Sequence, residues 1–196
     1  MAAERAGKAG KYRKGCAVIS LFNEVYRLLD KHPLALVDCG ELCGKMCCCY
    51  MFPDETETGM ELIPGEEDVF PLDAGWQCNR LLTGEIYDYP PEWGRDSGCI
   101  QIRCTEPCPR EQRPVNCRMF PFQVVLYEGQ YYLALTGSNL KYSCPLLSRP
   151  ELINPEFVEC ARQAAKLLLE IPKFRQLVDW DSREVDLDSN SFMKII

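Results

Sequence analysis

The sequence predicts an α+β fold, in the form of a small irregular metal-organised domain with a β-hairpin and two to four helices. Three observations lead to this prediction: helical periodicity toward both ends of the chain, two apolar runs around a glycine turn, and cysteine-rich segments without periodicity. Of the 196 residues, 13 are Cys and one is His. Thiolates are therefore the metal ligands available to organise the cysteine-rich segments that lack periodicity.

Helices are predicted in the first and last quarters of the chain. Over residues 17–29 apolar side chains recur at spacings of three and four, and a His-Pro pair follows. Near the other end, Asn154 is a predicted N-cap with proline at the first helical position. The apolar face that follows predicts a helix up to residue 171, and a short helix is expected over 174–180.

The middle of the chain predicts strands and irregular structure. Residues 122–127 and 131–135 are apolar runs on either side of a turn that contains Gly129, which is typical of a β-hairpin. A short strand is expected over 60–63. Residues 85–120 are rich in Pro, Gly and Cys and show no clear period, so we expect something other than apolar burial to order them.

The length suits one domain of ordinary size. Residues 1–14 carry five basic side chains and one acidic one, and they are interpreted as a basic flexible tail. Residues 15–180 form the predicted cysteine-cluster metal-binding domain. The acidic and then apolar segment 181–196 is assigned to a C-terminal tail.

Charge and hydropathy exclude some classes of partner. A net charge of −7 argues against nucleic-acid binding through phosphate contacts. Apolar runs long enough to span a membrane are absent from the sequence, so we expect a cytoplasmic protein, where thiols stay reduced and dense cysteine indicates metal or redox chemistry. The acidic loop 54–73 is either simply solvated or contacts a protein partner with a basic face.

The first cysteine cluster spans eleven residues and holds five cysteines: Cys39, Cys43, Cys47, Cys48 and Cys49. Cysteines four residues apart on a glycine-containing loop can converge on one centre. Adjacent residues of an extended chain point to opposite sides, so the three consecutive cysteines are not all expected to bind one ion. We predict Cys39, Cys43, Cys47 and Cys48 as metal ligands, with the roles of the consecutive residues left open.

The second cluster adds four predicted ligands, which are Cys104, Cys108, Cys117 and Cys144. Proline follows Cys108 and Cys144, as it does after cysteine ligands in some ferredoxins. Four thiolates around a dication leave a net charge of about −2, which is costly to bury without nearby cations. Arg113 and Arg118 are the predicted cofactor-binding arginines, although a simple surface position is the alternative for each.

Cys99 begins the second cluster but is not a predicted ligand, and Cys16, Cys78 and Cys160 stand alone. Cys16 and Cys160 lie on predicted helix faces with apolar neighbours and are interpreted as packed small hydrophobes. Cys78 fits either role. His32, beside a helix end and a proline, is interpreted as a surface or capping residue, and catalytic residues are not assigned.

Together these residues resemble a known family. The pieces that carry the resemblance are Cys39-x3-Cys43-x3-Cys47-Cys48, Pro64-Gly65-Glu66 and Arg113-Pro114-x2-Cys117-Arg118-x-Phe120-Pro121. They are similar to the YkgJ-type cysteine-cluster family, a zinc- or iron-chelating domain with a CxxCxxCC core. The resemblance covers roughly residues 36–147 and departs in its x3 spacings and its third consecutive cysteine. It implies metal or iron–sulfur binding but no settled reaction. A related cluster occurs in a flagellin lysine methylase, which makes protein modification conceivable.

All-thiolate ligation suits both an iron–sulfur cluster and a four-cysteine zinc site. The surplus of cysteines, the recurring Cys-Pro and the absence of Cys-x2-Cys knuckles favour iron, with a 4Fe–4S cluster as the first choice and zinc as the alternative. The run 39–47 comes within one residue of the radical-SAM signature, but alternating strand–helix units are missing. An enzyme with a redox or protein-modification role and a non-catalytic zinc scaffold or interaction module both stay open.

Overall fold

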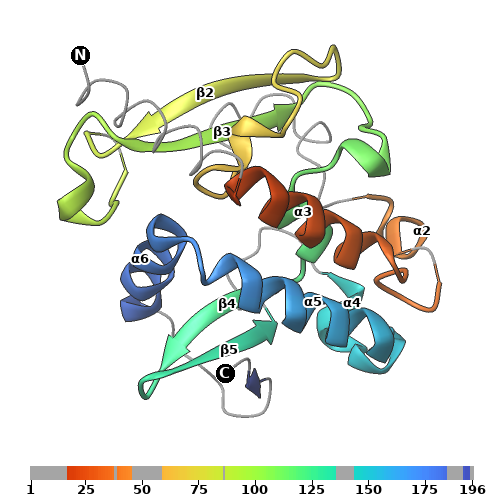
Figure 1. Cartoon of the computed structure of the whole chain (residues 1–196). Coiled ribbons are helices and arrows are strands. Elements are labelled where there is room, and N and C mark those ends of the chain that lie inside the picture. The colour runs from red at the N-terminus through yellow and green to blue at the C-terminus, as the bar shows by residue number, and fades with distance from the viewer. Residues whose placement is uncertain are drawn as a thin grey trace.

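The computed structural model describes residues 17–37, 39–45, 59–85, 87–135, 144–184 and 192–194, without the side chains of 39, 40, 184 and 192–194 (Figure 1). The predicted tail 1–14 and part of the acidic loop 54–73 lie outside these residues. So do Cys16 and the three consecutive cysteines, Cys47, Cys48 and Cys49.

The α+β class is confirmed, because the described chain combines helices with two antiparallel three-stranded sheets. The first sheet has the order β1-β3-β2, with β1 at Met60–Glu61, β2 at Gln77–Thr83 and β3 at Gly98–Cys104. The β2 and β3 strands are absent from the sequence-based prediction. Most of β2 is exposed, so it lacks the apolar alternation that signals a half-buried strand.

The second sheet contains the predicted hairpin. Its strands β4 (Phe122–Tyr127) and β5 (Gln130–Leu135) are joined by Glu128 and Gly129, whose φ angles of 47° and 75° are the positive values that a two-residue hairpin turn requires. A third strand, β6 (Phe192–Lys194), pairs with β5. It comes from the segment assigned to the C-terminal tail.

The long helices agree with the prediction. They cover residues 17–30, α5 (Pro155–Leu168) and α6 (Pro172–Asp181). Asn154 caps α5, since its side-chain oxygen accepts from the backbone N–H of Glu156 at 3.0 Å. Three further α-helices are only four or five residues long: α2 (Cys39–Cys43), α3 (Val115–Met119) and α4 (Pro145–Ser148).

Single 3-10 turns join these elements. They are η2 (Glu66–Asp68), η3 (Pro91–Trp93), η4 (Arg110–Gln112), η5 (Pro150–Leu152) and η6 (Ser182–Glu184).

The largest core lies between helix 17–30, α5 and the second sheet. In Figure 1 the helix drawn in red crosses the middle of the molecule, with β2 and β3 on one side and α5 on the other. Phe22, Leu29, Phe157 and Leu133 are each at most 1% exposed in this core. Because α2, α3 and α4 are too short to be stable alone, packing against this core must hold them.

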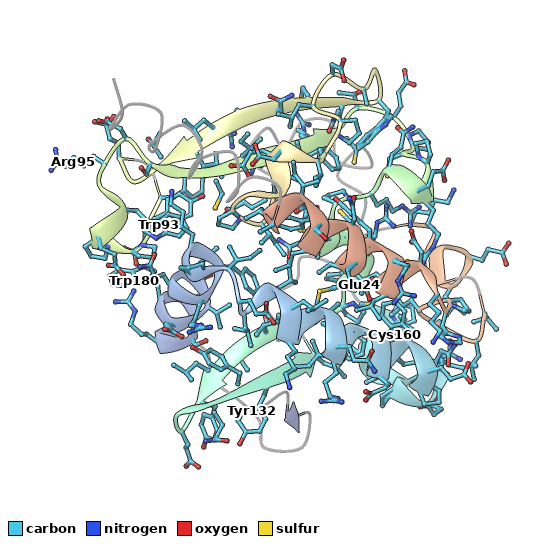
Figure 2. The ribbon with its side chains drawn as sticks, viewed as in Figure 1. Glu24, Trp93, Arg95, Tyr132, Cys160 and Trp180 are labelled. Atoms are coloured by element: carbon cyan, nitrogen blue, oxygen red, sulfur yellow. The ribbon has the colours of Figure 1, made fainter. Side chains whose placement is uncertain are left out.

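Two smaller cores include residues of the first sheet. Phe70, Trp76 and Ile102 belong to one of them. Trp93 belongs to the other, and it lies against α6 (Figure 2), where its indole N–H donates to Gln176 Oε1 at 2.8 Å. Within the part of the chain described, none of the helices is both long and apolar enough to cross a bilayer.

Candidate metal centre

Five of the eight predicted ligands have described side chains. Cys43, Cys104, Cys108 and Cys117 are half-buried, and Cys144 is buried. Cys39 begins α2, but its side chain lies outside the description, as do Cys47 and Cys48.

Cys104 and Cys108 form a thiol pair. Cys104 ends β3, and the loop that follows returns Cys108 to within hydrogen-bonding reach of it. The hydrogen bond from Cys104, followed by the hydrogen bond and charge of Arg113, lowers the pKa of Cys108 to about 6 even though burial opposes this shift. These contacts favour the thiolate form of Cys108, which is the form that binds metals.

Trp76 anchors the loop that carries this pair. Its carbonyl accepts from the N–H of Thr105 at 2.9 Å, and its indole N–H donates to Gln112 Oε1 at 2.6 Å. Cys104 and Cys108 also pack against the small core to which Trp76 belongs. The sheet and the tryptophan thus determine where the two thiols lie.

Cys43 and Cys144 lie on two helices that contact each other. Cys43 is the last residue of α2, and Cys144 is the residue before the first turn of α4. The two helices pack together, and Leu42 contacts the core that contains Cys144. Segments about one hundred residues apart in sequence therefore bring two predicted ligands to one side of the molecule (Figure 1).

Cys117 lies in the middle of α3. The negative charge of its thiolate raises the pKa of Tyr26, after the larger effects of burial and of Glu66, so Cys117 lies close to this ring on helix 17–30. Arg118, the next residue, is 4% exposed. Its guanidinium lies 4.4 Å from the centre of the Tyr26 ring.

The two predicted arginines differ in their contacts. Arg113 hydrogen-bonds Cys108, where a guanidinium can compensate thiolate charge. Arg118 donates to the carbonyls of Arg113 and Glu111, each at 2.7 Å, and to Asp30 Oδ2 at 2.5 Å. These contacts of Arg118 brace the loop that follows Cys108.

Glu66 is a site residue that the sequence-based prediction missed. It belongs to the acidic loop 54–73, yet it is fully buried. Its carboxylate accepts from the Tyr26 hydroxyl at 2.5 Å, from Val115 N–H at 2.7 Å and from Ile63 N–H at 2.9 Å. Burial raises its pKa, and these donors act in the opposite direction. The Pro64-Gly65-Glu66 piece of the family resemblance was the available signal.

A pocket of about 240 Å³ lies over this network. Its polar wall includes Tyr26, Asp30, Arg113 and Arg118. Val69, Phe70 and Pro71 are the apolar residues of its lining. A small molecule in this pocket would contact Arg113, and Arg113 in turn hydrogen-bonds Cys108.

The isolated residues take ordinary positions. Cys160 is 5% exposed on α5 (Figure 2), which confirms its packed role, whereas Cys78 is exposed on β2. Cys99 is buried beside Tyr89 and Glu61, and these neighbours hydrogen-bond it. His32 Nδ1 lies 3.0 Å from Glu156 in the first turn of α5, consistent with a surface position at a helix end.

The described side chains include one pair of predicted ligands in contact, Cys104 and Cys108. Among the described residues, no group of three or more His, Cys, Asp or Glu side chains lies close enough together to hold a metal ion. The Cys104–Cys108 pair offers two soft thiolate donors with a cation beside them, which suits zinc or an iron–sulfur cluster once further thiolates are added. The chain matches neither a family model nor a curated protein nor a solved structure, so the YkgJ-type resemblance stays a prediction.

Proposed function

We propose that this protein binds an iron–sulfur cluster, of the 4Fe–4S type, through cysteine thiolates, as the YkgJ-type resemblance implies. The observation that carries the proposal is the contact between Cys104 and Cys108 with Arg113 hydrogen-bonded to Cys108. Two thiols and a guanidinium lie together in one half-buried loop, where the guanidinium can offset the charge of thiolate ligands. A soft metal centre is the ligand that this donor set suits.

In this proposal the remaining thiolates come from the 39–49 cluster, Cys117 and Cys144. When bound, the cluster supplies one-electron chemistry in a redox or protein-modification role. Arg113 compensates part of the thiolate charge, and Arg118 holds the loop between Cys108 and Cys117 in place. The pocket that Arg113 lines would let a small molecule reach this region, and both an enzyme and a structural module stay open.

A zinc-binding scaffold is the alternative function. Four thiolates also form a closed structural zinc site, and the described pair needs only two more ligands. In this case the acidic loop 54–73 would contact a protein partner without catalysis. Both functions place the protein in the cytoplasm, because they need reduced thiols.

Anaerobic purification separates the two functions. An absorption spectrum with iron, sulfide and zinc counts per chain is expected to give about four irons and four sulfides for one cluster, or about eight of each for two. The control is the Cys78→Ser variant, which changes an exposed cysteine outside the predicted ligands and should keep the wild-type content. A chain that takes up only zinc under iron and sulfide reconstitution would overturn the iron–sulfur function, and a chain that takes up neither would overturn both.

A further inference from the structure

The helix that carries Cys117 needs external support. It has only five residues, and Pro114 at its N-cap makes no side-chain capping bond. The residues around Cys117 are each tied to a distant segment. Val115 N–H donates to Glu66, and the Asn116 side chain donates to the carbonyl of Glu61 at 2.8 Å. Cys117 is thus held on a short helix by bonds that its neighbours make.

Glu66 is the centre of this support. One oxygen, Oε1, accepts from both Tyr26 on helix 17–30 and Val115 on α3, while Oε2 accepts from Ile63. A single fully buried carboxylate therefore joins three segments that lie far apart in sequence. A carboxylate is expensive to bury, and three donors offset that cost.

Arg118 also contacts Tyr26, through the face of its ring. It stacks on that ring and pairs with Asp30, one turn further along the same helix. Its remaining bonds go to the carbonyls of Glu111 and Arg113. Helix 17–30, the loop after Cys108 and the helix of Cys117 are therefore linked by side-chain bonds.

We infer that Glu66, together with Tyr26 and Arg118, is a positioning residue that holds α3 in place and so sets the direction of the Cys117 side chain. We call these three residues the Glu66 clamp. The inference rests on the proposed function, since it takes Cys117 to be a metal ligand. Groups that orient metal ligands typically contribute 10–100-fold to metal affinity.

The test replaces Glu66 with its neutral isostere. Glu66→Gln keeps the shape but puts an NH2 group against backbone and hydroxyl donors. The matched control is Glu67→Gln, because Glu67 is an exposed neighbour that accepts from Gly65 N–H. Each chain is reconstituted anaerobically with ferrous iron and sulfide, and separately with Zn(II), and metal release to a chelator is timed. We expect release from Glu66→Gln to be about 10–100-fold faster than from wild type, and release from Glu67→Gln to be unchanged.

A second comparison separates positioning from general stability. Leu82→Ala opens a cavity in the core beside Trp93, away from the clamp. At a temperature where all variants are folded, it should release metal at the wild-type rate and keep the wild-type absorption spectrum, whereas Glu66→Gln should shift that spectrum. If Glu66→Gln does not fold, Tyr26→Phe decides, since it removes one hydroxyl and keeps the ring under Arg118.

The outcomes are distinct. Wild type that binds neither iron nor zinc overturns the proposed function, and the inference with it. Wild type that binds metal, alongside clamp variants with wild-type release, overturns the inference alone. Equal acceleration in Leu82→Ala and Glu66→Gln also overturns it, because lost stability would then explain the effect.

Discussion

Trp76 donates its indole N–H to Gln112 Oε1 at 2.6 Å across 36 residues of sequence. The same residue accepts from Thr105 through its carbonyl. Because these two bonds hold both sides of the loop that contains Cys108, the position of the thiol pair depends on a tryptophan that is not itself a ligand. Trp76 is 8% exposed, so its N–H has little access to water.

Removal of the Gln112 side chain should therefore destabilise the protein. Gln112→Ala leaves the indole N–H without its acceptor, which is expected to cost about 1–3 kcal/mol in the free energy of unfolding. Adding Trp76→Phe to this variant should cost less than the sum of the two single changes. Urea titrations measure all three, with the exposed Gln163→Ala as a control that stays near wild type. Equal stability of Gln112→Ala and Gln163→Ala would contradict the prediction.

Metal removal should abolish cooperative unfolding of the cysteine-rich half. The α2, α3 and α4 helices have four or five residues each, and the predicted ligands lie on or beside them. Metal binding in domains of this kind is coupled to folding. Calorimetry on chelated and metal-loaded samples tests this, and an unchanged melting transition after complete metal removal would show that the fold does not need the metal.

Substitution of Cys117 and of Cys160 should affect different properties of the protein. Cys117→Ser replaces a thiolate on α3 with a poorer ligand and should lower the metal content per chain. Cys160→Ala removes one sulfur from the packed face of α5 and should cost about 1–2 kcal/mol with the metal retained. Metal analysis of both variants decides, and equal loss in the two would refute the assignment of Cys117.

Cys99 should make stability depend on alkaline pH. Burial, followed by the negative charge of Glu61, raises its pKa from 9.0 to about 12. Between these values the folded chain keeps a proton that the unfolded chain has released, so the contribution of Cys99 to stability is complete below about pH 9 and falls as pH rises toward 12. From about pH 8 to about pH 10.5, wild type should lose about 2 kcal/mol relative to Cys99→Ala.

Urea unfolding of both chains at the two pH values measures this difference. Cys78→Ala, on the neighbouring strand β2, is the control for removal of an exposed cysteine and should follow the wild-type profile. If the difference in the free energy of unfolding between wild type and Cys99→Ala stayed constant across this range, the pKa of Cys99 would be the same in the folded and unfolded chains.

The local structure could be predicted because it depends on residues that are close together in the sequence. The period of three to four over 17–29, the Asn-Pro start of α5 and the glycine turn of the hairpin each encode their own element. The β2 strand escaped prediction because its exposed residues do not alternate with buried ones. The all-thiolate donor set with arginines stays a prediction from composition and spacing, and within it the structure brings Cys104, Cys108 and Arg113 together.

Which of these residues meet was decided by the tertiary structure. The contact of Tyr26 with Glu66 spans 40 residues and that of Arg118 with Asp30 spans 88. The Pro64-Gly65-Glu66 piece marks Glu66 in the sequence but does not predict its burial, which depends on donors supplied by helix 17–30 and α3. The sequence by itself determined the three long helices and the hairpin, because short-range periodicity and turn residues encode them. The partner of each charged group depended on chain segments that come together only on folding, where burial makes an unpaired charge too costly to keep.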